Sequence, residues 1–381
     1  MKSRWNDDEA RDYCRRYQAR GESLALRIYT SRLIGGDPQL VLHGGGNTSV
    51  KATARDLFGR EIDVMHVKGS GSDLGAVEPQ GLPAVRLAPL RELRQLERLA
   101  DADMVNAVRA ALLDSTAPNP SVEALLHAFL PHRFVDHTHA DAILVLTDQP
   151  DSEDYVRDAF GDEVAVLPWI MPGFPLAKAV IEACERRPDC RGILLRKHGL
   201  FTFGDDARES YERTIELVDR AEHYISRRIG GVPAMLCGEP APLAESERRA
   251  VLAVAMPTLR GAVATRVDSP IGPQWLRPVA VARIGEETAS FAAHSAAPGL
   301  CAQGPITPDH VIRTKGHYMF LSREEVSRPD LCHRGVANFA AAYQRYYDEC
   351  CRGFGSAMIA PEPVVAVIEG TGLIAFGETA R

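Results

Sequence analysis

Residues 192–203 read Gly-Ile-Leu-Leu-Arg-Lys-His-Gly-Leu-Phe-Thr-Phe, a stretch that indicates how the chain folds. Two short apolar runs with strand-forming composition flank a break at His198 and Gly199. Glycine tolerates backbone conformations that other residues avoid, so the chain can turn there and carry the His198 imidazole to the rim of a sheet. The stretch therefore predicts a β-hairpin or bend with a histidine at its tip.

A second strand with histidines is predicted at Phe134 to His139. Residues two apart in a strand point to the same face, about 7 Å apart at Cα, so His137 and His139 are placed to chelate one ion while Thr138 faces away. In a chain with twelve histidines such a pair is weak evidence by itself, and two structural or surface histidines are the more common explanation. A metal site needs a third ligand.

His198 is the best candidate for this third ligand. Three neutral imidazoles on Zn²⁺ leave one coordination position open, which a catalytic site requires. His43, His127 and His132 compete for the role. His127 is more simply explained as the surface partner of Glu123, four residues earlier on a helix, and His132 as a solvated residue at a helix end.

Two aspartates flank the histidine pair. Asp136 and Asp141 are candidates to orient the imidazoles by accepting their N–H groups. An aspartate next to a strand end is also commonly just solvated.

Two strand-to-turn units come earlier in the chain. A helix capped by Ser23 ends at Gly35 and Gly36, and a strand-like run then enters a glycine turn, Leu42-His43-Gly44-Gly45-Gly46-Asn47-Thr48-Ser49-Val50. A strand from Ile62 to Val67 enters a second turn, Lys68-Gly69-Ser70-Gly71-Ser72-Asp73.

Helices are predicted between and after these strands. Ala102 to Leu113 has helical periodicity, and after the breaker at residues 117–120 another helix begins with Ser121 as N-cap and Glu123 in its first turn. Asp205 can cap a long amphipathic helix that ends at Gly230 and Gly231. The apolar run Ala142 to Thr147 is predicted to be a strand.

The length of 381 residues indicates two domains, because single cores stop growing near 250 to 300 residues. The Pro- and Gly-rich segment Gly230 to Pro242 is the linker candidate, which predicts a first domain at 1–230 and a second at 243–381. The second contains a helix from Glu245 to Ala264, a strand from Val279 to Ile284 and a helix near Val336 to Tyr347.

Composition narrows the class of protein. The net charge of −7 offers no broad basic surface for nucleic acid. No run of 18 apolar residues and no signal-like N-terminus occurs, so we expect a cytoplasmic protein without membrane partners. The eight cysteines form no CxxC pair or compact framework and are predicted to be free thiols, although adjacent Cys350 and Cys351 could be redox-active.

Five motifs occur in an order that resembles the class II aldolase/adducin family: Gly44-Gly45-Gly46-Asn47-Thr48-Ser49, Ser70-Gly71, Pro120-Ser121-Val122-Glu123, His137-Thr138-His139-Ala140 and Lys197-His198-Gly199. The later run from Thr307 to Lys315 is similar to the region after the aldolase part of rhamnulose-1-phosphate aldolase/alcohol dehydrogenase fusions. The resemblance implies a layered α/β/α domain with a central mixed sheet, followed by a smaller C-terminal α+β extension.

The resemblance also implies roles for single residues. His137, His139 and His198 would bind Zn²⁺, or another divalent cation such as Mn²⁺ or Mg²⁺, and Glu123 would be the catalytic acid/base. The ion would stabilise the enediolate left by aldol cleavage without a lysine Schiff base. Without the resemblance, Glu123 reads as an ordinary acidic residue at a helix start.

The substrate phosphate would be held by Asn47, Ser70, Gly71 and Ser121, in turns that offer hydroxyl and N–H groups to an anion. Two positions depart from the family pattern. Val122 replaces a frequent second serine, and Lys68 stands where threonine is frequent, so the cation either compensates for the missing donor or marks a differently charged substrate.

The resulting prediction is a metal-dependent aldolase that reversibly cleaves a ketose 1-phosphate, with rhamnulose 1-phosphate as the first candidate. A related sugar-phosphate epimerase, dehydratase or decarboxylase and a non-catalytic adducin-like scaffold remain alternatives. The resemblance further implies a homo-oligomer, for which a tetramer is common in the family, and the fusions suggest a dehydrogenase partner. Residues 69–72 are not a dinucleotide-binding fingerprint, because no βαβ unit surrounds them.

Overall fold

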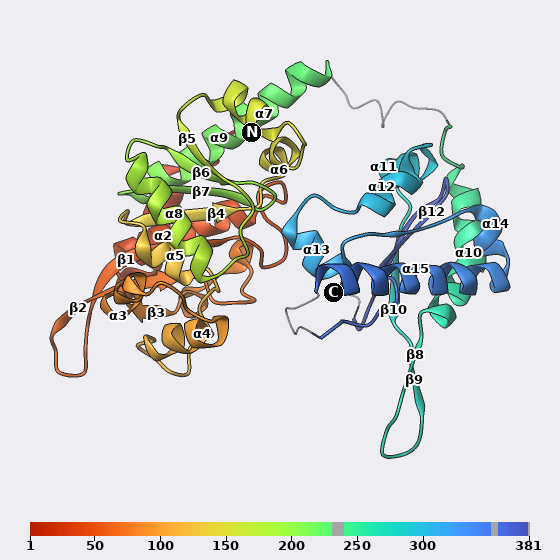
Figure 1. Ribbon diagram of the computed structural model, residues 1–381, viewed down its shortest axis with the longest axis horizontal. Coiled ribbons are helices and arrows are strands. Elements are labelled where there is room, and N and C mark those ends of the chain that lie inside the picture. The colour runs from red at the N-terminus through yellow and green to blue at the C-terminus, as the bar shows by residue number, and fades with distance from the viewer. Residues whose placement is uncertain (231–239, 352–356, 380–381) are drawn as a thin grey trace. The chain divides into compact units, whose positions relative to one another are not determined.

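The computed structural model describes residues 1–230, 240–351 and 357–379 (Figure 1). The chain forms two compact units, Met1–Arg228 with Ile306–Asp309, and Ile229–Pro305 with His310–Arg381. The sequence-based boundaries assigned all of 243–381 to the second domain. The segment Ile306–Asp309 instead belongs to the first unit, a placement that depends on long-range contacts and not on any local pattern. The predicted linker, Gly230 to Pro242, lies mostly outside the described residues.

The first unit is built on one mixed sheet in the order β3-β2-β1-β4-β7-β6-β5. The strands β5 and β6 run parallel, and the other neighbouring pairs are antiparallel. The predicted hairpin is confirmed, because β6 and β7 pair directly, with Leu195 opposite Gly199. The strand bounds are Asn47–Arg55 for β1, Glu61–Val67 for β2, Ala84–Arg86 for β3, Phe134–Thr138 for β4, Val164–Leu167 for β5, Gly192–Leu195 for β6 and Gly199–Gly204 for β7.

Helices cover both faces of this sheet, as Figure 1 shows. Alternate residues of β6 enter different cores: Ile193 packs in the cluster that includes residues of α5 and α8, and Leu194 in the cluster that includes residues of α6, α7 and α9. The predicted α/β/α layering is therefore confirmed. The helices are α1 (Asp7–Arg16), α2 (Glu22–Gly35), α3 (Leu87–Glu92), α4 (Asp101–Ala110), α5 (Ala124–Phe129), α6 (Asp141–Thr147), α7 (Ser152–Phe160), α8 (Phe174–Arg186) and α9 (Ala207–Ile229), with short 3₁₀ turns at Gln18–Arg20, Leu74–Ala76, Pro79–Gly81 and Leu93–Gln95.

One predicted strand is wrong. Ala142 to Thr147 forms α6, in which Ile143, Leu144 and Leu146 are buried. A short, fully apolar run cannot be assigned to strand or helix by periodicity, and packing against the sheet decided it.

The predicted helix caps also shift. Gly21, with a φ of 87°, precedes α2 in place of Ser23. The helix α5 begins at Ala124 with Glu123 at the N-cap position, so Ser121 lies two residues outside it. Asp206, and not Asp205, caps α9 by accepting the Glu209 amide at 2.8 Å. Only Asp206 makes a side-chain capping hydrogen bond, whereas Gly21 and Glu123 stand at the N-cap position without one.

The second unit is an α+β structure with a four-stranded sheet in the order β10-β13-β12-β11 and a separate two-stranded β8-β9 ribbon. Its main core includes residues of α10, α15 and this sheet. The elements are α10 (Glu245–Ala262), β8 (Thr265–Val267), β9 (Gln274–Leu276), β10 (Val279–Arg283), α11 (Glu286–Ala293), α12 (Ala297–Gln303), α13 (Pro308–Thr314), β11 (Met319–Leu321), α14 (Arg323–Ser327), α15 (Pro329–Cys350), β12 (Val365–Ile368) and β13 (Gly372–Gly377).

Two predictions from composition can be compared with the structure. In the described parts of the chain, no helix combines the length and apolar character needed to cross a membrane. The described cysteines are free thiols, as predicted, and Cys237 lies outside the described residues.

Candidate metal centre

His137 and His139 lie where β4 leaves the middle of the sheet, between β1 and β7. The strand's pleat turns both imidazoles to one face, and their Nε2 atoms are 3.0 Å apart. Both side chains are buried. The predicted side-by-side placement is therefore present in the structure.

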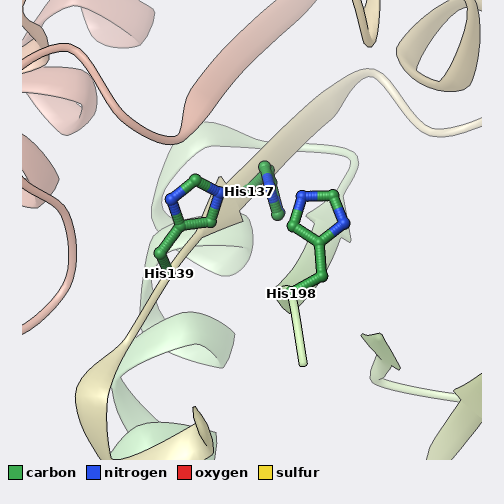
Figure 2. Close-up of side chains that lie close together, drawn as sticks. All are labelled: His137, His139 and His198. Atoms are coloured by element: carbon green, nitrogen blue, oxygen red, sulfur yellow. Dashed lines mark hydrogen bonds between the residues drawn. The ribbon is translucent and has the colours of Figure 1, made fainter. Parts of the chain in front are cut away.

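His198 joins them from the tip of the β6-β7 hairpin, and Figure 2 shows the three rings grouped together. Its ring centre lies 5.0 Å from that of His137 and 5.5 Å from that of His139. One ligand nitrogen from each residue lies within 4.8 Å of the others. Lys197, just before His198, has a φ of 60°, the left-handed conformation that lets the hairpin turn tightly enough.

Gly199 makes this approach sterically possible. A Cβ atom at this position would lie 2.2 Å from the Thr138 carbonyl oxygen, 3.1 Å from His137 Cε1 and 3.2 Å from His139 Cδ2. Any side chain would push the hairpin away from β4. The glycine thus allows the tip of one strand pair to pack against the two histidines of another strand.

Hydrogen bonds determine the tautomers of the paired histidines. The Nδ1–H of His137 donates to the Leu200 carbonyl oxygen at 3.1 Å, and the Nδ1–H of His139 donates to Asp309 Oδ1 at 2.9 Å. In neutral rings both Nε2 atoms then carry lone pairs that face each other across 3.0 Å. That arrangement is repulsive unless a cation lies nearby.

The cation that fits this site is a metal ion and not a proton. Burial, and next the neighbouring His139 and His198, lower the pKa of His137 well below 6.5, and burial also lowers the pKa of His198. The imidazoles of His137 and His198 are therefore neutral near pH 7, the form that binds metals. Three buried imidazoles match the donor set of a divalent ion such as Zn²⁺.

Glu123 completes the cluster. Its Oε2 lies 3.4 Å from His137 Nε2, and its Oε1 lies 3.4 Å from His198 Nε2. Oε1 is buried and has no hydrogen-bond partner among the described residues. A buried carboxylate oxygen in this position is suited to bind a metal ion or to exchange a proton with a ligand beside it.

Asn47 positions this carboxylate. Its side-chain Nδ2 donates to Glu123 Oε2 at 2.6 Å, and its Oδ1 accepts from His127 Nε2. Asn47 lies opposite His137 in the β1-β4 register, so the strand pairing itself brings the amide to the site. Asn47 is predicted from the family resemblance to bind the substrate phosphate, and in the structure its amide is bound to Glu123 and His127.

His127 does not lie on the surface as the sequence predicts. It is not a surface partner of Glu123 but fully buried, and Ser49 Oγ donates to its Nδ1 at 2.8 Å. Burial lowers its pKa well below 6.5, so the ring is a neutral link between Ser49 and Asn47. The whole of α5 is buried, and the apolar residues on both sides of His127 were the available signal. His132 is half-buried and stacks on Phe203, with ring centres 4.2 Å apart, and is not simply solvated.

The two flanking aspartates do not orient the imidazoles. Asp136 points to the opposite side of β4, where it pairs with Arg27 at 2.5 Å and accepts from Ser210. Asp141 makes no hydrogen bond to His137 or His139 in the described structure, and burial, with the charge of Asp309 next, raises its pKa to about 6. The expected orienting role of Asp136 and Asp141 is therefore wrong, because strand alternation and the start of α6 direct them elsewhere.

The turns predicted to hold phosphate lie next to each other. Gly69 and Pro120 form an isolated β-bridge, Ser70 N donates to the Asn119 carbonyl at 2.7 Å, and Ser121 N donates to the Lys68 carbonyl at 2.9 Å. These two amides are therefore engaged within the protein. Gly71, with a φ of 78°, is exposed, and no partner for its amide is found in the described chain.

The two positions that depart from the family pattern have different surroundings. Lys68 is buried, and its Nζ donates to the carbonyl oxygens of Gly44 and Gly46, which braces the glycine turn before β1. Val122 is 55% exposed beside Glu123. Lys68 thus has a structural explanation, and Val122 leaves an apolar surface where a hydroxyl is frequent.

Two family profiles match the chain. The profile for the Class II Aldolase and Adducin N-terminal domain matches residues 26–225, and the profile for the second domain of class II aldolases matches residues 250–381. Together they cover most of both compact units.

The chain is similar to an uncharacterized oxidoreductase, YuxG, of Bacillus subtilis (strain 168), at 34% identity over 92% of this chain and 50% of that protein. It thus spans about half the length of this curated relative. It is also similar to the solved N-terminal class II aldolase domain of a conserved protein from Thermoplasma acidophilum, with 43% identity, a TM-score of 0.52 and coverage of 59% of this chain and 99% of that one. The histidine cluster, the sheet that carries it and these matches agree: the chain belongs to the class II aldolase and adducin family.

Proposed function

We propose that this protein is a divalent-metal-dependent lyase that reversibly cleaves a ketose 1-phosphate to dihydroxyacetone phosphate and an aldehyde, with rhamnulose 1-phosphate as the first substrate to test. One observation carries the proposal: three buried histidines bring ligand nitrogens within 4.8 Å of one another, and Glu123 stands 3.4 Å from two of them. A scaffold protein would have no use for such a set of buried, unsatisfied donor atoms. Membership of the aldolase family supports the same class of reaction.

His137, His139 and His198 would hold the ion, with Zn²⁺ as first choice for three imidazoles and Mn²⁺ or Mg²⁺ as alternatives. When bound, the ion would stabilise negative charge on the enediolate oxygens formed by cleavage. The chain's own contribution is to present three imidazole rings in one buried place. The pleat of β4 places His137 and His139, and the hairpin turn places His198.

Glu123 would move the protons. In the cleavage direction the C3–C4 bond breaks, the C4 hydroxyl loses its proton as C4 becomes the aldehyde carbon, and C3 gains a proton to complete dihydroxyacetone phosphate. Asn47 Nδ2 holds Oε2 and leaves Oε1 available for this exchange. His127 in turn binds Asn47 Oδ1, so two successive hydrogen bonds fix the orientation of the Glu123 carboxylate.

The substrate phosphate would lie against the adjoining turns at residues 69–71 and 119–121. The Ser70 and Ser121 hydroxyls and the Gly71 amide are the groups that remain to bind it, with Asn47 nearby on β1. Lys68 Nζ donates to two carbonyl oxygens of the glycine turn, and its positive charge acts on His137, so it would attract the phosphate through space. The hydroxyl and amide groups would supply the directional hydrogen bonds.

A substrate panel tests the proposal. The metal-free protein would be loaded with Zn²⁺, Mn²⁺ or Mg²⁺ and incubated with ketose 1-phosphates and their non-phosphorylated counterparts, with aldehyde release as the measurement. We expect release only from a phosphorylated ketose and only with metal. If a fully loaded protein releases no aldehyde from any of them, aldol cleavage is rejected. Product analysis would then identify an epimerase, dehydratase or decarboxylase of the same family.

Two partner predictions remain part of the proposal. We expect a homo-oligomer, with a tetramer as the first form to look for by sedimentation. The similarity to a longer protein named an oxidoreductase supports a dehydrogenase that acts on the product. An NAD-linked dehydrogenase that oxidises the aldehyde to a carboxylate, with water as co-substrate, would reduce NAD⁺, so NADH formation from the ketose phosphate would test that coupling.

A further inference from the structure

Asp309 contacts the candidate metal centre from far along the sequence. Its Oδ1 accepts the Nδ1–H of His139 at 2.9 Å, and its Oδ2 accepts the Leu42 amide at 3.0 Å. The carboxylate is buried, and its segment, Ile306–Asp309, belongs to the first compact unit although some 75 residues of the second unit separate it from α9 in the chain. Asp309 lies in residues 250–381, the match of the second-domain profile, and not in residues 26–225, the match of the N-terminal profile that contains the three histidines.

We propose that Asp309 is the positioning residue of the metal centre, which fixes the orientation and tautomer of His139 and increases its affinity for the ion. This inference rests on the metal-dependent function proposed above. A carboxylate that accepts the Nδ1–H of a ligand histidine keeps the lone pair on Nε2 and makes that nitrogen more basic. Removing such a partner typically weakens metal binding 10- to 100-fold.

The surrounding structure is shaped to receive this carboxylate. A Cβ atom at Gly45 would lie 1.7 Å from Asp309 Oδ1 and 2.4 Å from Oδ2. Only glycine therefore leaves room for the side chain between the turn and His139. Because Asn47 follows two residues later at the start of β1, the same turn joins Asp309 to the residue that holds Glu123.

The three ligand histidines differ in this respect. His137 donates to a neutral carbonyl, whereas His139 donates to a charged carboxylate. The Nδ1 atom of His198 is buried without a partner in the part of the chain that the structure describes. Asp309 thus supplies the negatively charged support for the ligand set, which compensates part of the charge of a divalent ion.

Asp309→Asn in the full-length protein tests the proposal directly. Asparagine keeps the shape but has one acceptor, so its NH₂ group must face either the Leu42 amide or His139 Nδ1. Facing His139, it would favour the tautomer with a proton on Nε2, which removes the ligand lone pair. We expect Zn²⁺ affinity, measured by chelator competition, to fall 10- to 100-fold, and the visible absorption spectrum of the Co²⁺-loaded protein to change.

A second variant does not touch the aspartate. Gly45 has no positive φ, so Gly45→Ala is compatible with the backbone, but its methyl group would displace the Asp309 carboxylate. We expect a similar loss of Zn²⁺ affinity, with no further loss in the Gly45→Ala, Asp309→Asn double variant. This variant decides the question if Asp309→Asn does not fold.

Asp141→Asn is the matched control. Asp141 is a partly buried acid close enough for Asp309 to affect its pKa, yet in the described structure it binds neither paired histidine. We expect its Zn²⁺ affinity and Co²⁺ spectrum to stay as in the unmodified protein, and the melting temperature of metal-free Asp309→Asn to stay close to that of the control.

Unchanged Zn²⁺ affinity and an unchanged Co²⁺ spectrum in both Asp309→Asn and Gly45→Ala would overturn the proposal. Equal losses in Asp141→Asn would also overturn it, since the effect would then be general charge. These measurements need no substrate. If Asp309→Asn weakens Zn²⁺ binding as expected but the unmodified protein cleaves no ketose phosphate, the role of Asp309 stands and the lyase function is rejected.

Discussion

The three histidines of the candidate metal centre are held by different means, and this determines the expected effect of each substitution. His137 is stacked on Phe201, with ring centres 4.0 Å apart, and is bound to a backbone carbonyl. His139 depends on a side chain, and His198 on the turn that carries it. The backbone thus determines two of the three positions, while Asp309 helps to determine the other.

His139→Ala should remove one metal ligand and with it the activity. We expect the metal content to fall from about one ion per chain to a small fraction, and aldehyde release to become undetectable. Metal analysis after gel filtration measures the first. His223→Ala, on the exposed surface of α9, is the control that should keep both. Full metal occupancy in His139→Ala would show that the ligand set is wrong.

Glu123→Gln separates metal binding from proton transfer. Glutamine can keep the hydrogen bond with Asn47 through its oxygen but cannot exchange a proton near neutrality. We therefore expect Zn²⁺ to stay bound while kcat falls by about 100-fold or more. Steady-state kinetics at saturating metal measure this. Turnover close to normal would exclude Glu123 as the acid/base.

The buried histidines make the stability of the metal-free protein depend on pH. Burial lowers the folded-state pKa of His127 and His137 well below 6.5, whereas both titrate near 6.5 when unfolded. Below about pH 6.5 the unfolded chain therefore binds more protons. The free energy of unfolding should fall with decreasing pH, by up to about 1.4 kcal/mol per pH unit for each histidine.

Urea titrations at pH 7.0, 6.0 and 5.0 without metal would measure this dependence. His127→Gln, which retains groups able to bond Ser49 and Asn47, should reduce the slope because one titrating site is lost. If the slope were the same in both proteins, the pKa of His127 would not be lowered as described.

At the scale of elements, the site depends on how closely the β6-β7 hairpin approaches β4. The register places Thr138 opposite Leu200, and Gly199 then lies against the Thr138 carbonyl. On the other side of β4, the buried Arg27–Asp136 pair joins α2 to the same strand. These contacts hold the strand that carries His137 both through its neighbouring strand and from the face of the sheet that α2 covers.

Gly199→Ala should disrupt this approach. The added methyl group would meet backbone and two imidazoles, so we expect a loss of about 2 kcal/mol or more in unfolding free energy and weaker Zn²⁺ binding. Chemical denaturation and chelator competition measure the two effects. In Gly261→Ala, within α10, the new Cβ meets nothing within 4 Å, and the protein should be as stable or slightly more so. Equal stability of the two variants would contradict the close packing.

At the scale of the whole molecule, two units with separate cores should respond differently to metal. The histidine cluster lies in the first unit, whose cores are distinct from the main core of the second. A ligand that binds only folded protein stabilises it by about 2.7 kcal/mol at 100 times its Kd.

We therefore expect calorimetry of the full chain to show that Zn²⁺ raises the unfolding temperature of one transition, and that a chelator reverses the shift. His139→Ala, measured in parallel, should lack the shift. A single transition, shifted as a whole by Zn²⁺, would contradict this expectation and show that the two units unfold together.

The sequence alone was sufficient for much of the fold, because the relevant signals are local. A strand is predicted from the alternation along Phe134 to His139, and a hairpin from the break at His198 and Gly199. Both patterns depend only on a few neighbouring residues. Ala142 to Thr147 was misassigned, since a uniformly apolar run has no periodicity to interpret. This segment, α6, packs against α7 and β7, and that packing favours a helix.

The site divides in the same way. The histidine pair, the turn at His198 and the glycine turn before Asn47 follow from the sequence, because pleat and turn chemistry act over a few residues. The tertiary structure alone decided that His127 is buried, that Asp136 faces away from the histidines, and that Asp309 lies beside His139, 170 positions away. Hydrogen bonds between distant segments form only once the sheet and both cores have assembled, and no local pattern records them.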